Sequence, residues 1–315
     1  MNNAVKLVSV GCTFPRKVMT NQDFEKMVDT SDEWIVTRTG IKERRICEEE
    51  MNLELATKAA KNALEQASEK VPGFSIEKVG AVLVATSSYE DRLPAISCLL
   101  QRELGLPESI FAMDIGAACS GFVYGVYLAE ALLKAKEMEY VLVVGSECLS
   151  KITDYTDRST CILFGDGAGA ALFSLTNHSV GFTGTVGTRG NDAILGCRRN
   201  EKIHMEGQEV FRFAVGAVGN VVEKLLRDSK ITMDQIDYVV CHQANARIIE
   251  FLKKKYPGQE EKFYMNIERY GNTSAASIPI ALWEMDQKGM LEKGMNILCI
   301  GFGGGLTWGG VLITV

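Results

Sequence analysis

Long hydrophobic runs are missing from this sequence. No run of apolar residues approaches the roughly 18 that a membrane-spanning helix needs. Residues 1–6 have neither the charged start nor the long apolar stretch of a secretory signal. We therefore expect a cytoplasmic protein that does not enter a membrane, with its first strand close to the N-terminus.

Metal-binding and nucleotide-binding patterns are also missing. The nine cysteines are scattered without a Cys-x-x-Cys pair and there are only three histidines, so we expect neither structural zinc nor a disulfide framework. A net charge of −6, from 34 Lys and Arg against 40 Asp and Glu, argues against general nucleic-acid binding. The glycine-rich residues 165–169 lack the Lys-Ser/Thr ending of a phosphate loop, which excludes nucleoside triphosphate binding.

The composition is that of a globular protein with a large core. The chain has 315 residues, 46% hydrophobic and 23% charged, which suits about two domains. Short β-branched runs at 79–85, 111–115 and 140–144 read as buried strands, and residues 53–67 have helical spacing. Such strands separated by helices predict an α/β fold whose strands are covered on both faces.

An internal repeat of long period is the more informative signal. Phe-Ala-Met-Asp-Ile at 111–115 matches Phe-Tyr-Met-Asn-Ile at 263–267. Each follows a strand and a helical segment, and each precedes a small-residue turn, an apolar helix, a further strand and a glycine-rich hairpin. This order predicts a duplicated α/β fold with halves at 1–174 and 175–315; two unrelated stretches with chance similarity are the alternative.

Two segments stand out within this repeat. The helix expected at 121–134 is apolar nearly all round, which predicts that the two halves bury it between them. Residues 181–207 are rich in Gly, Thr, Arg and Asn and show little periodicity. We interpret them as a long functional loop that leads into the second half.

Cys119 is the candidate nucleophile. It lies in Gly-Ala-Ala-Cys-Ser-Gly-Phe at 116–122, between a strand and the apolar helix, where small neighbours permit a sharp turn. The positive end of the helix dipole and free N–H groups at a helix start favour the thiolate form of a cysteine. A buried structural cysteine is the alternative.

His242 and Asn272 are the candidate partners of Cys119. His242 directly follows the strand 238–241, at the kind of strand end where α/β folds bind ligands. Asn272 begins the turn that the repeat equates with the Cys119 turn, so the two turns are expected to face each other with His242 beside them. A structural histidine and a plain helix cap are the alternatives for these two residues. The glycines at 303–305 could aim backbone N–H groups at an oxyanion, or could simply form a hairpin.

These residues resemble those of the β-ketoacyl-acyl-carrier-protein synthase III family, the initiating condensing enzymes of bacterial fatty-acid synthesis in the thiolase superfamily. The resemblance covers essentially the whole chain. It is carried by the motifs TSDEWIVTRTGI at 30–41, AACSG at 117–121, TDR at 156–158, FGDGAG at 164–169, HQAN at 242–245, GNTSAA at 271–276 and FGGG at 302–305.

The resemblance implies a homodimer of subunits with the thiolase-like duplicated αβαβα five-layer fold. It implies a catalytic Cys119, His242 and Asn272, with an oxyanion hole formed by the backbone N–H groups of Cys119 and Gly304. The implied coenzyme A contacts are Trp34, Arg38, Arg158, Phe211 and Asn245. The implied docking face for acyl carrier protein comprises Arg212, Arg247, Lys254 and Lys255, a positive area suited to an acidic partner. The lysines of this run could also be only a solvated helix end.

Two positions depart from the family pattern. Ser159 follows Arg158 where the best-known members have glycine, a change that a small polar residue should allow. Leu93 stands where some members have a phenylalanine that reaches the acyl pocket of the partner subunit. Because leucine is smaller, we expect Leu93 to affect the depth of that pocket and the length of the acyl primer.

The implied activity is a two-step acyl transfer without a metal or redox cofactor. An acyl-CoA such as acetyl-CoA acylates the cysteine, and malonyl carrier protein then loses carbon dioxide and attacks the acyl group to give a 3-oxoacyl carrier protein. A condensing enzyme of secondary metabolism with another primer is the close alternative. A Cys-His-Asn peptidase or amidase and a non-catalytic acyl-binding subunit are the others. Neither of these two needs all of the motifs above.

Overall fold

The computed structural model describes residues 3–135, 138–177 and 180–315. The strands are β1 (Asn3–Thr13), β2 (Lys17–Thr20), β3 (Glu43–Ile46), β4 (Val79–Ala85), β5 (Phe111–Ile115), β6 (Tyr140–Glu147), β7 (Gly167–Asn177), β8 (Thr183–Asn191), β9 (Leu195–Gly196), β10 (His204–Met205), β11 (Tyr238–Cys241), β12 (Phe263–Tyr264), β13 (Asn296–Gly303) and β14 (Gly305–Thr314). The predicted first strand is therefore confirmed as β1 from Asn3; Met1 and Asn2 lie outside the described residues.

Helices alternate with these strands along the chain. They are α1 (Asn21–Glu25), α2 (Asp32–Thr39), α3 (Asn52–Lys70), α4 (Ile96–Leu104), α5 (Gly121–Ala135), α6 (Arg158–Cys161), α7 (Gly207–Ser229), α8 (Ala246–Lys255), α9 (Ile267–Tyr270) and α10 (Ser277–Gln287). Short 3₁₀ turns are η1 (Ile76–Lys78), η2 (Ala118–Ser120), η3 (Leu149–Ile152), η4 (Met233–Gln235), η5 (Glu260–Lys262) and η6 (Ser274–Ala276).

The strand order shows the duplication directly. One set of strands runs β5-β4-β6-β7-β1 and the other runs β12-β11-β13-β14-β8, so each member of the first set has a counterpart in the second. In each set the first three strands are parallel and the last two are antiparallel to their neighbours. The two sets meet where β1 lies beside β14, at a single paired position, Lys6 with Thr314.

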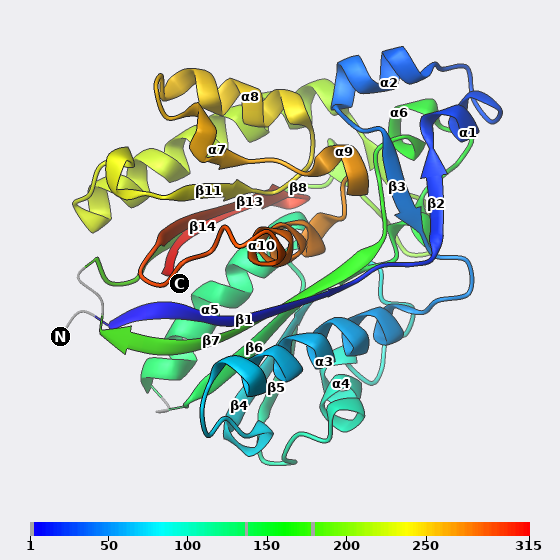
Figure 1. The fold of residues 1–315 in the computed structure, drawn as a ribbon. Coiled ribbons are helices and arrows are strands. Elements are labelled where there is room, and N and C mark those ends of the chain that lie inside the picture. The colour runs from blue at the N-terminus through cyan, green and yellow to red at the C-terminus, as the bar shows by residue number, and fades with distance from the viewer. Residues whose placement is uncertain (1–2, 136–137, 178–179) are drawn as a thin grey trace.

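The helices and the two sheets form five layers (Figure 1). Helices α3 and α4 pack on the outer face of the first sheet, and α7 and α8 pack on the outer face of the second. Helices α5 and α10 lie between the sheets and share one hydrophobic core with strands of both. The expected thiolase-like αβαβα arrangement is therefore confirmed.

Helix α5 lies in the middle layer because it is apolar over most of its circumference, with Glu130 and Lys134 as its charged residues. Phe122, Val123, Val126, Ala129 and Leu133 are each no more than 1% exposed. Burying one large apolar side chain of this kind contributes roughly 1.5–3 kcal/mol. A charged substitution on this buried face would therefore be strongly destabilising. The packing of α5 also holds the turn before it, η2, in which Cys119 lies.

Three expectations about the repeat need correction. Residues 181–207 are not one long loop, because Thr183–Asn191 forms β8, which pairs with β14. The residues of β8 show no alternating hydrophobic pattern, so the pairing with β14 is what makes this segment a strand. The segment 263–267 also differs from its counterpart 111–115 in secondary structure. Strand β12 covers only Phe263–Tyr264, and helix α9 begins at Ile267. Finally, β7 continues past the predicted boundary at 174 to Asn177.

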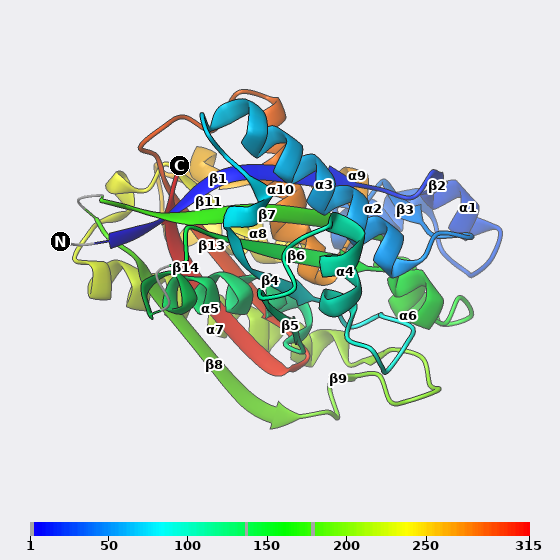
Figure 2. The same ribbon diagram turned by 90° about the horizontal axis from the view of Figure 1, so that it is seen from below.

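A small cap at one end of the sheets is formed by α1, α2, α6 and the antiparallel pair of strands β2 and β3 (Figures 1 and 2). Arg44 of β3 is fully buried within it, stacks 4.4 Å from the Phe24 ring and donates to Asn21 Oδ1 (2.8 Å) and to the carbonyl of Ile162 (2.5 Å). Burial lowers the pKa of Arg44 to about 10, so it stays charged at neutral pH. This side chain thereby joins the cap to the segment that precedes β7.

Among the residues that the structure describes, no helix combines the length and apolar character needed to cross a bilayer. The same residues contain no group of three or more His, Cys, Asp or Glu side chains that could together hold a metal ion.

Candidate active site

A sharp turn presents Cys119 at the start of the buried helix. Cys119 lies in η2, and Ala118 before it has a left-handed φ of 46°, a strained conformation for a residue with a side chain. The next residue, Ser120, donates to the carbonyl of Ala117 (2.8 Å) and contacts Thr307 Oγ1 (2.8 Å). The turn is thus fastened to the hairpin of β13 and β14 from the second half.

Gly303 allows this close approach between the halves. A Cβ at position 303 would lie 2.7 Å from the Cys119 nitrogen and 3.0 Å from its Cβ. Those distances are below ordinary contact, so only glycine leaves room for the turn that carries Cys119. The glycines at 303–305 therefore shape the site as well as forming a hairpin.

The protonation state of Cys119 differs from the sequence-based expectation. Burial raises the pKa of the Cys119 thiol to about 12, although a hydrogen bond with Ser274 acts in the opposite direction. The expected thiolate form is therefore not favoured. Desolvation outweighs the helix start here because the sulfur is enclosed between the two halves.

His242 lies at the end of β11, as expected. Its backbone N–H donates to the carbonyl of Ile300 (2.7 Å), and its ring packs edge-on to Phe302 with 5.2 Å between centroids. The residue is 1% exposed, and burial lowers the pKa of its imidazole to about 3. The ring is therefore neutral at physiological pH. Its Nδ1 contacts Ser277 Oγ at 2.7 Å, which leaves Nε2 for the cavity.

Asn272 is oriented by its own turn. Its Oδ1 accepts from the Ser274 backbone N–H (2.9 Å), and its backbone is fixed to Leu163 (2.9 Å) and Gly165 (3.0 Å). The oxygen therefore stabilises the turn itself, whereas the N-cap residues of η6 and α10 are Thr273 and Ala276. Because the oxygen is occupied, the amide NH₂ group is the part of the side chain left to donate into the cavity.

One cavity of about 1000 Å³ brings these three side chains together. The predicted residues that line it are Trp34, Arg38, Cys119, Arg158, Phe211, Arg212, His242, Asn245, Arg247, Asn272 and Gly304. Residues 195–197, 203 and 205, from the part of 181–207 that follows β8, also line it. That part of the expected functional loop does contact the cavity.

The predicted coenzyme A residues gather at two places along this cavity. The Arg38 and Arg158 guanidinium groups lie 5.7 and 5.2 Å from the Trp34 ring. Arg247 lies 5.4 Å from the Phe211 ring. Each place combines an aromatic face with a cation, an arrangement suited to a flat base or to an anionic phosphate. Asn245 uses its amide to cap α8 and to reach the Arg38 carbonyl (3.0 Å), so it also holds these parts together.

Three predicted residues lie away from the cavity lining. Leu93 is 86% exposed on the surface, and Lys254 and Lys255 are exposed at the end of α8. Ser159, by contrast, lines the cavity and donates to Asp157 Oδ1 (2.7 Å), which fits the expectation that a small polar residue is accommodated there.

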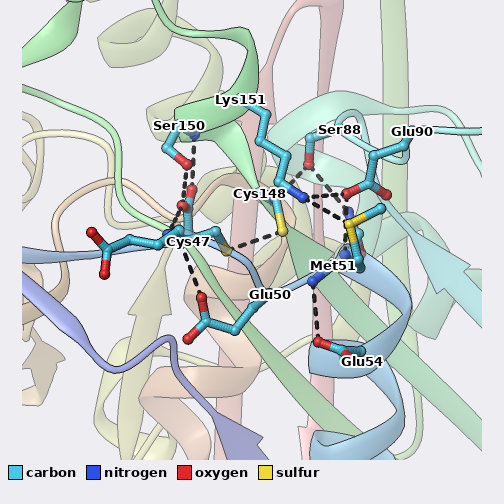
Figure 3. A network of polar contacts seen from close by, with 12 residues as sticks. Cys47, Glu50, Met51, Glu54, Ser88, Glu90, Cys148, Ser150 and Lys151 are labelled. Carbon is cyan, nitrogen blue, oxygen red and sulfur yellow. Dashed lines mark hydrogen bonds and ion pairs between the residues drawn. The ribbon is translucent and has the colours of Figure 1, made fainter.

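Buried polar contacts join the end of β6 to the segment that follows β4; Ser88 and Cys148 are labelled in Figure 3. Ser88 Oγ accepts from the Cys148 N–H (2.8 Å) and donates to Glu147 (2.5 Å), whose carboxylate also accepts from the Ser87 N–H (3.1 Å). Burial raises the pKa of Glu147 to about 7. No pattern in the sequence pointed to this carboxyl group, because it ends an otherwise apolar strand.

The same network contains two adjacent thiols, Cys47 and Cys148, whose sulfur atoms are 3.2 Å apart (Figure 3). All nine cysteines are free, and six of them are buried. The interpretation of most cysteines as small buried side chains is therefore confirmed.

Sequence reasoning missed Ser274 and Ser277, which contact Cys119 and His242 respectively. Both lie in the turn that carries Asn272. The available signal was the repeat itself, since η6 precedes α10 as η2, the turn of Cys119, precedes α5.

Comparison with known proteins agrees with this geometry. The family described as 3-oxoacyl-[acyl-carrier-protein] synthase III matches residues 113–189, and its C-terminal part matches residues 226–315. The chain is 41% identical to β-ketoacyl-[acyl-carrier-protein] synthase III of Clostridium acetobutylicum, over 99% of this chain and 98% of the relative.

Solved structures give the same result. The crystal structure of 3-oxoacyl-[acyl-carrier-protein] synthase III from Aquifex aeolicus is 42% identical, with a TM-score of 0.92 over 99% of this chain and all of that one. The priming β-ketosynthase of the R1128 polyketide pathway is 31% identical, with a TM-score of 0.90 over 99% of this chain and 96% of that one. This chain therefore belongs to the 3-oxoacyl-[acyl-carrier-protein] synthase III family.

Proposed function

We propose that this protein joins an acyl-CoA primer to malonyl carrier protein in a decarboxylative Claisen condensation that begins fatty-acid synthesis. The observation that carries the proposal is the shared cavity, which holds a thiol, a neutral imidazole and an oriented amide. Its cationic and aromatic residues suit a long ligand with a phosphate-bearing end. No metal or redox cofactor takes part, and coenzyme A enters only as part of the thioester substrate.

In the first half-reaction, Cys119 attacks the carbonyl carbon of the acyl-CoA. The thiol loses its proton, a sulfur–carbon bond forms, and the CoA sulfur leaves and takes up a proton. The backbone N–H groups of Cys119 and Gly304 hold the oxygen as it becomes negative. Phe211 and Asn245 lie along the pantetheine arm, and Trp34, Arg38 and Arg158 bind the nucleotide end.

In the second half-reaction, malonyl carrier protein occupies the same cavity. The bond to the terminal carboxylate breaks, carbon dioxide leaves, and the electron pair remains as an enolate whose oxygen accepts from His242 Nε2 and Asn272 Nδ2. The enolate carbon then attacks the acyl carbon on Cys119, the carbon–sulfur bond breaks to release the 3-oxoacyl thioester, and the cysteine sulfur takes up a proton from water. A neutral donor pair suits this step because negative charge develops beside it.

The carrier protein docks beside the mouth of the cavity. Arg212 and Arg247 line that mouth, and Lys254 and Lys255 are exposed on α8, of which Arg247 is the second residue. Because the chain as a whole is acidic, this local group of cations gives an acidic carrier a defined place to bind.

The functional unit is a homodimer. Strand β5 is the edge of the first sheet, and its Phe111 and Met113 are 41% and 37% exposed, although we had expected a strand covered on both faces. An exposed apolar edge strand needs a partner, and a second β5 would supply one. Leu93, exposed in the single chain, is then free to reach the acyl pocket of the partner subunit.

A cytoplasmic location completes the proposal. The nine cysteines are scattered without the regular spacing of a disulfide framework, which suits a reducing compartment.

Intact-protein mass spectrometry after incubation with a panel of acyl-CoAs tests the proposal. We expect an acyl adduct on Cys119, absent in Cys119→Ser, and carbon dioxide release when malonyl carrier protein follows. The chain length that accumulates identifies the primer. Absence of any adduct would refute the proposal and favour a peptidase or a non-catalytic acyl-binding subunit, while a long or unusual primer would favour secondary metabolism.

A further inference from the structure

A single hydroxyl group holds the inner nitrogen of the His242 ring. Ser277, the first residue of α10, is 2% exposed, and its Oγ lies 2.7 Å from His242 Nδ1. A neutral imidazole has one N–H, and the partner of one ring nitrogen decides which nitrogen carries it. The contact with Ser277 therefore bears on what the outer nitrogen, Nε2, can do in the cavity.

The surroundings of Ser277 Oγ leave its one hydrogen two possible directions. The Gln243 backbone N–H lies 3.4 Å away and can only donate to the oxygen. The Ser274 carbonyl lies 2.9 Å away and can only accept. The hydrogen therefore points either to Ser274 or to His242 Nδ1.

Each direction fixes a different form of the histidine. If the hydroxyl donates to Ser274, His242 Nδ1 must carry the ring hydrogen and Nε2 faces the cavity as an acceptor. If the hydroxyl donates to Nδ1, Nε2 carries the hydrogen and faces the cavity as a donor. An enolate oxygen is stabilised only by the second form.

We propose that Ser277 is a positioning residue for the condensation, whose hydroxyl donates to His242 Nδ1 and so places the ring hydrogen on Nε2. This inference rests on the proposed function for its catalytic consequence, but the position of the hydrogen can be measured without any substrate. Ser277 acts through His242 and does not itself touch the substrate.

The two halves of the repeat show that the hydroxyl is specific to this side of the site. Helix α5 begins with Gly121 directly after η2, and α10 begins with Ser277 directly after η6, so the two positions correspond. At Gly121 a Cβ would lie 2.7 Å from Ala85 Cβ, which leaves no room for a side chain. The second half has a hydroxyl at this position, next to the histidine that needs one.

Nitrogen-15 NMR of protein labelled in histidine tests the position of the hydrogen. The His242 signals are assigned by their loss in His242→Asn. We expect the parent protein to show hydrogen on Nε2 and Ser277→Ala to lose that preference. A parent signal with hydrogen on Nδ1 would overturn the inference, even if the protein had a different activity.

Single-turnover assays test the consequence. Removing a partner that orients a functional histidine typically costs about 10- to 100-fold in activity. We expect Ser277→Ala to slow carbon dioxide release from malonyl carrier protein by that factor and to keep acylation of Cys119 within a few-fold of the parent rate. Ser277→Thr, which keeps a hydroxyl group, should recover most of the lost rate of carbon dioxide release. Decarboxylation at the parent rate in Ser277→Ala, or an equal loss in both half-reactions, would overturn the inference.

Ser9→Ala is the matched control. Ser9 is a buried serine of β1 that donates to the carbonyl of Ala63 (2.7 Å), and it is not among the residues that line the cavity. Its loss should leave both half-reactions and the His242 signals unchanged. If parent protein fails to release carbon dioxide at all, the proposed function fails, while the NMR result still decides the role of Ser277.

Discussion

Replacing Asn272 by aspartate separates the two jobs of this side chain. In the parent protein, Oδ1 accepts from the Ser274 N–H, and the amide NH₂ is left to donate. Asn272→Asp keeps an oxygen for the Ser274 N–H, so the turn should hold. It replaces the donor with a carboxylate oxygen, so the enolate loses one of its two hydrogen bonds.

The magnitude follows from the loss of one preorganised donor. Such a loss typically costs about 100- to 1000-fold in rate, or roughly 2.7–4 kcal/mol in the barrier. The position is 7% exposed, and burial disfavours a charged carboxylate. Once protonated, the introduced aspartate can donate again. We therefore expect decarboxylation by Asn272→Asp to be slow near pH 8 and to recover as the pH falls.

The assay measures release of labelled carbon dioxide from malonyl carrier protein, and in parallel the acylation of Cys119 by labelled acyl-CoA. Both are followed from about pH 5.5 to about pH 8.5, a range in which the fold should persist. Asn272→Ala, which cannot donate at any pH, is the control and should show no recovery. Acylation should survive in both variants. Decarboxylation by Asn272→Asp at the parent rate near pH 8 would refute the reasoning and leave Asn272 with a role in its turn only.

Other perturbations test the rest of the site. Because the pKa of Cys119 is raised to about 12, its acylation rate should rise about tenfold per pH unit between pH 6.5 and 8.5; a plateau in stopped-flow acylation would show a stable thiolate instead. Gly303→Ala should slow acylation by at least about tenfold through displacement of Cys119, whereas Gly216→Ala, where a Cβ meets nothing within 4 Å, should not; equal single-turnover rates would contradict this. Arg247→Glu should weaken condensation, measured as kcat/KM for the carrier protein, and make it less dependent on salt. An equal loss of acylation would show that Arg247, which lines the cavity, serves acyl-CoA binding and not carrier docking.

Much of the architecture could be predicted from the sequence because it depends on local patterns. The apolar strands, the largely apolar helix α5 and the order of elements in the repeat all follow from periodicity. The same repeat predicted that the turns of Cys119 and Asn272 face each other. Strand β8 could not be predicted in this way, since its pairing with β14 and not its own residues makes it a strand.

Protonation states could not be predicted from the sequence, because they depend on what surrounds each group in space. The helix start suggested a thiolate at Cys119, but enclosure between the two halves raises its pKa instead. Glu147 ends an apolar strand, and only its buried contacts with Ser87 and Ser88 show that it belongs to the site.

The sequence by itself determined the duplicated α/β fold and pointed to Cys119, His242 and Asn272 as candidate catalytic residues, because periodicity and motif order are written along the chain. Only the tertiary structure decided how these residues can act. Packing of the two halves encloses the thiol, keeps the imidazole neutral and sets Ser277 against its inner nitrogen. Desolvation and hydrogen-bond direction arise from contacts between residues far apart in the chain, so no local pattern encodes them.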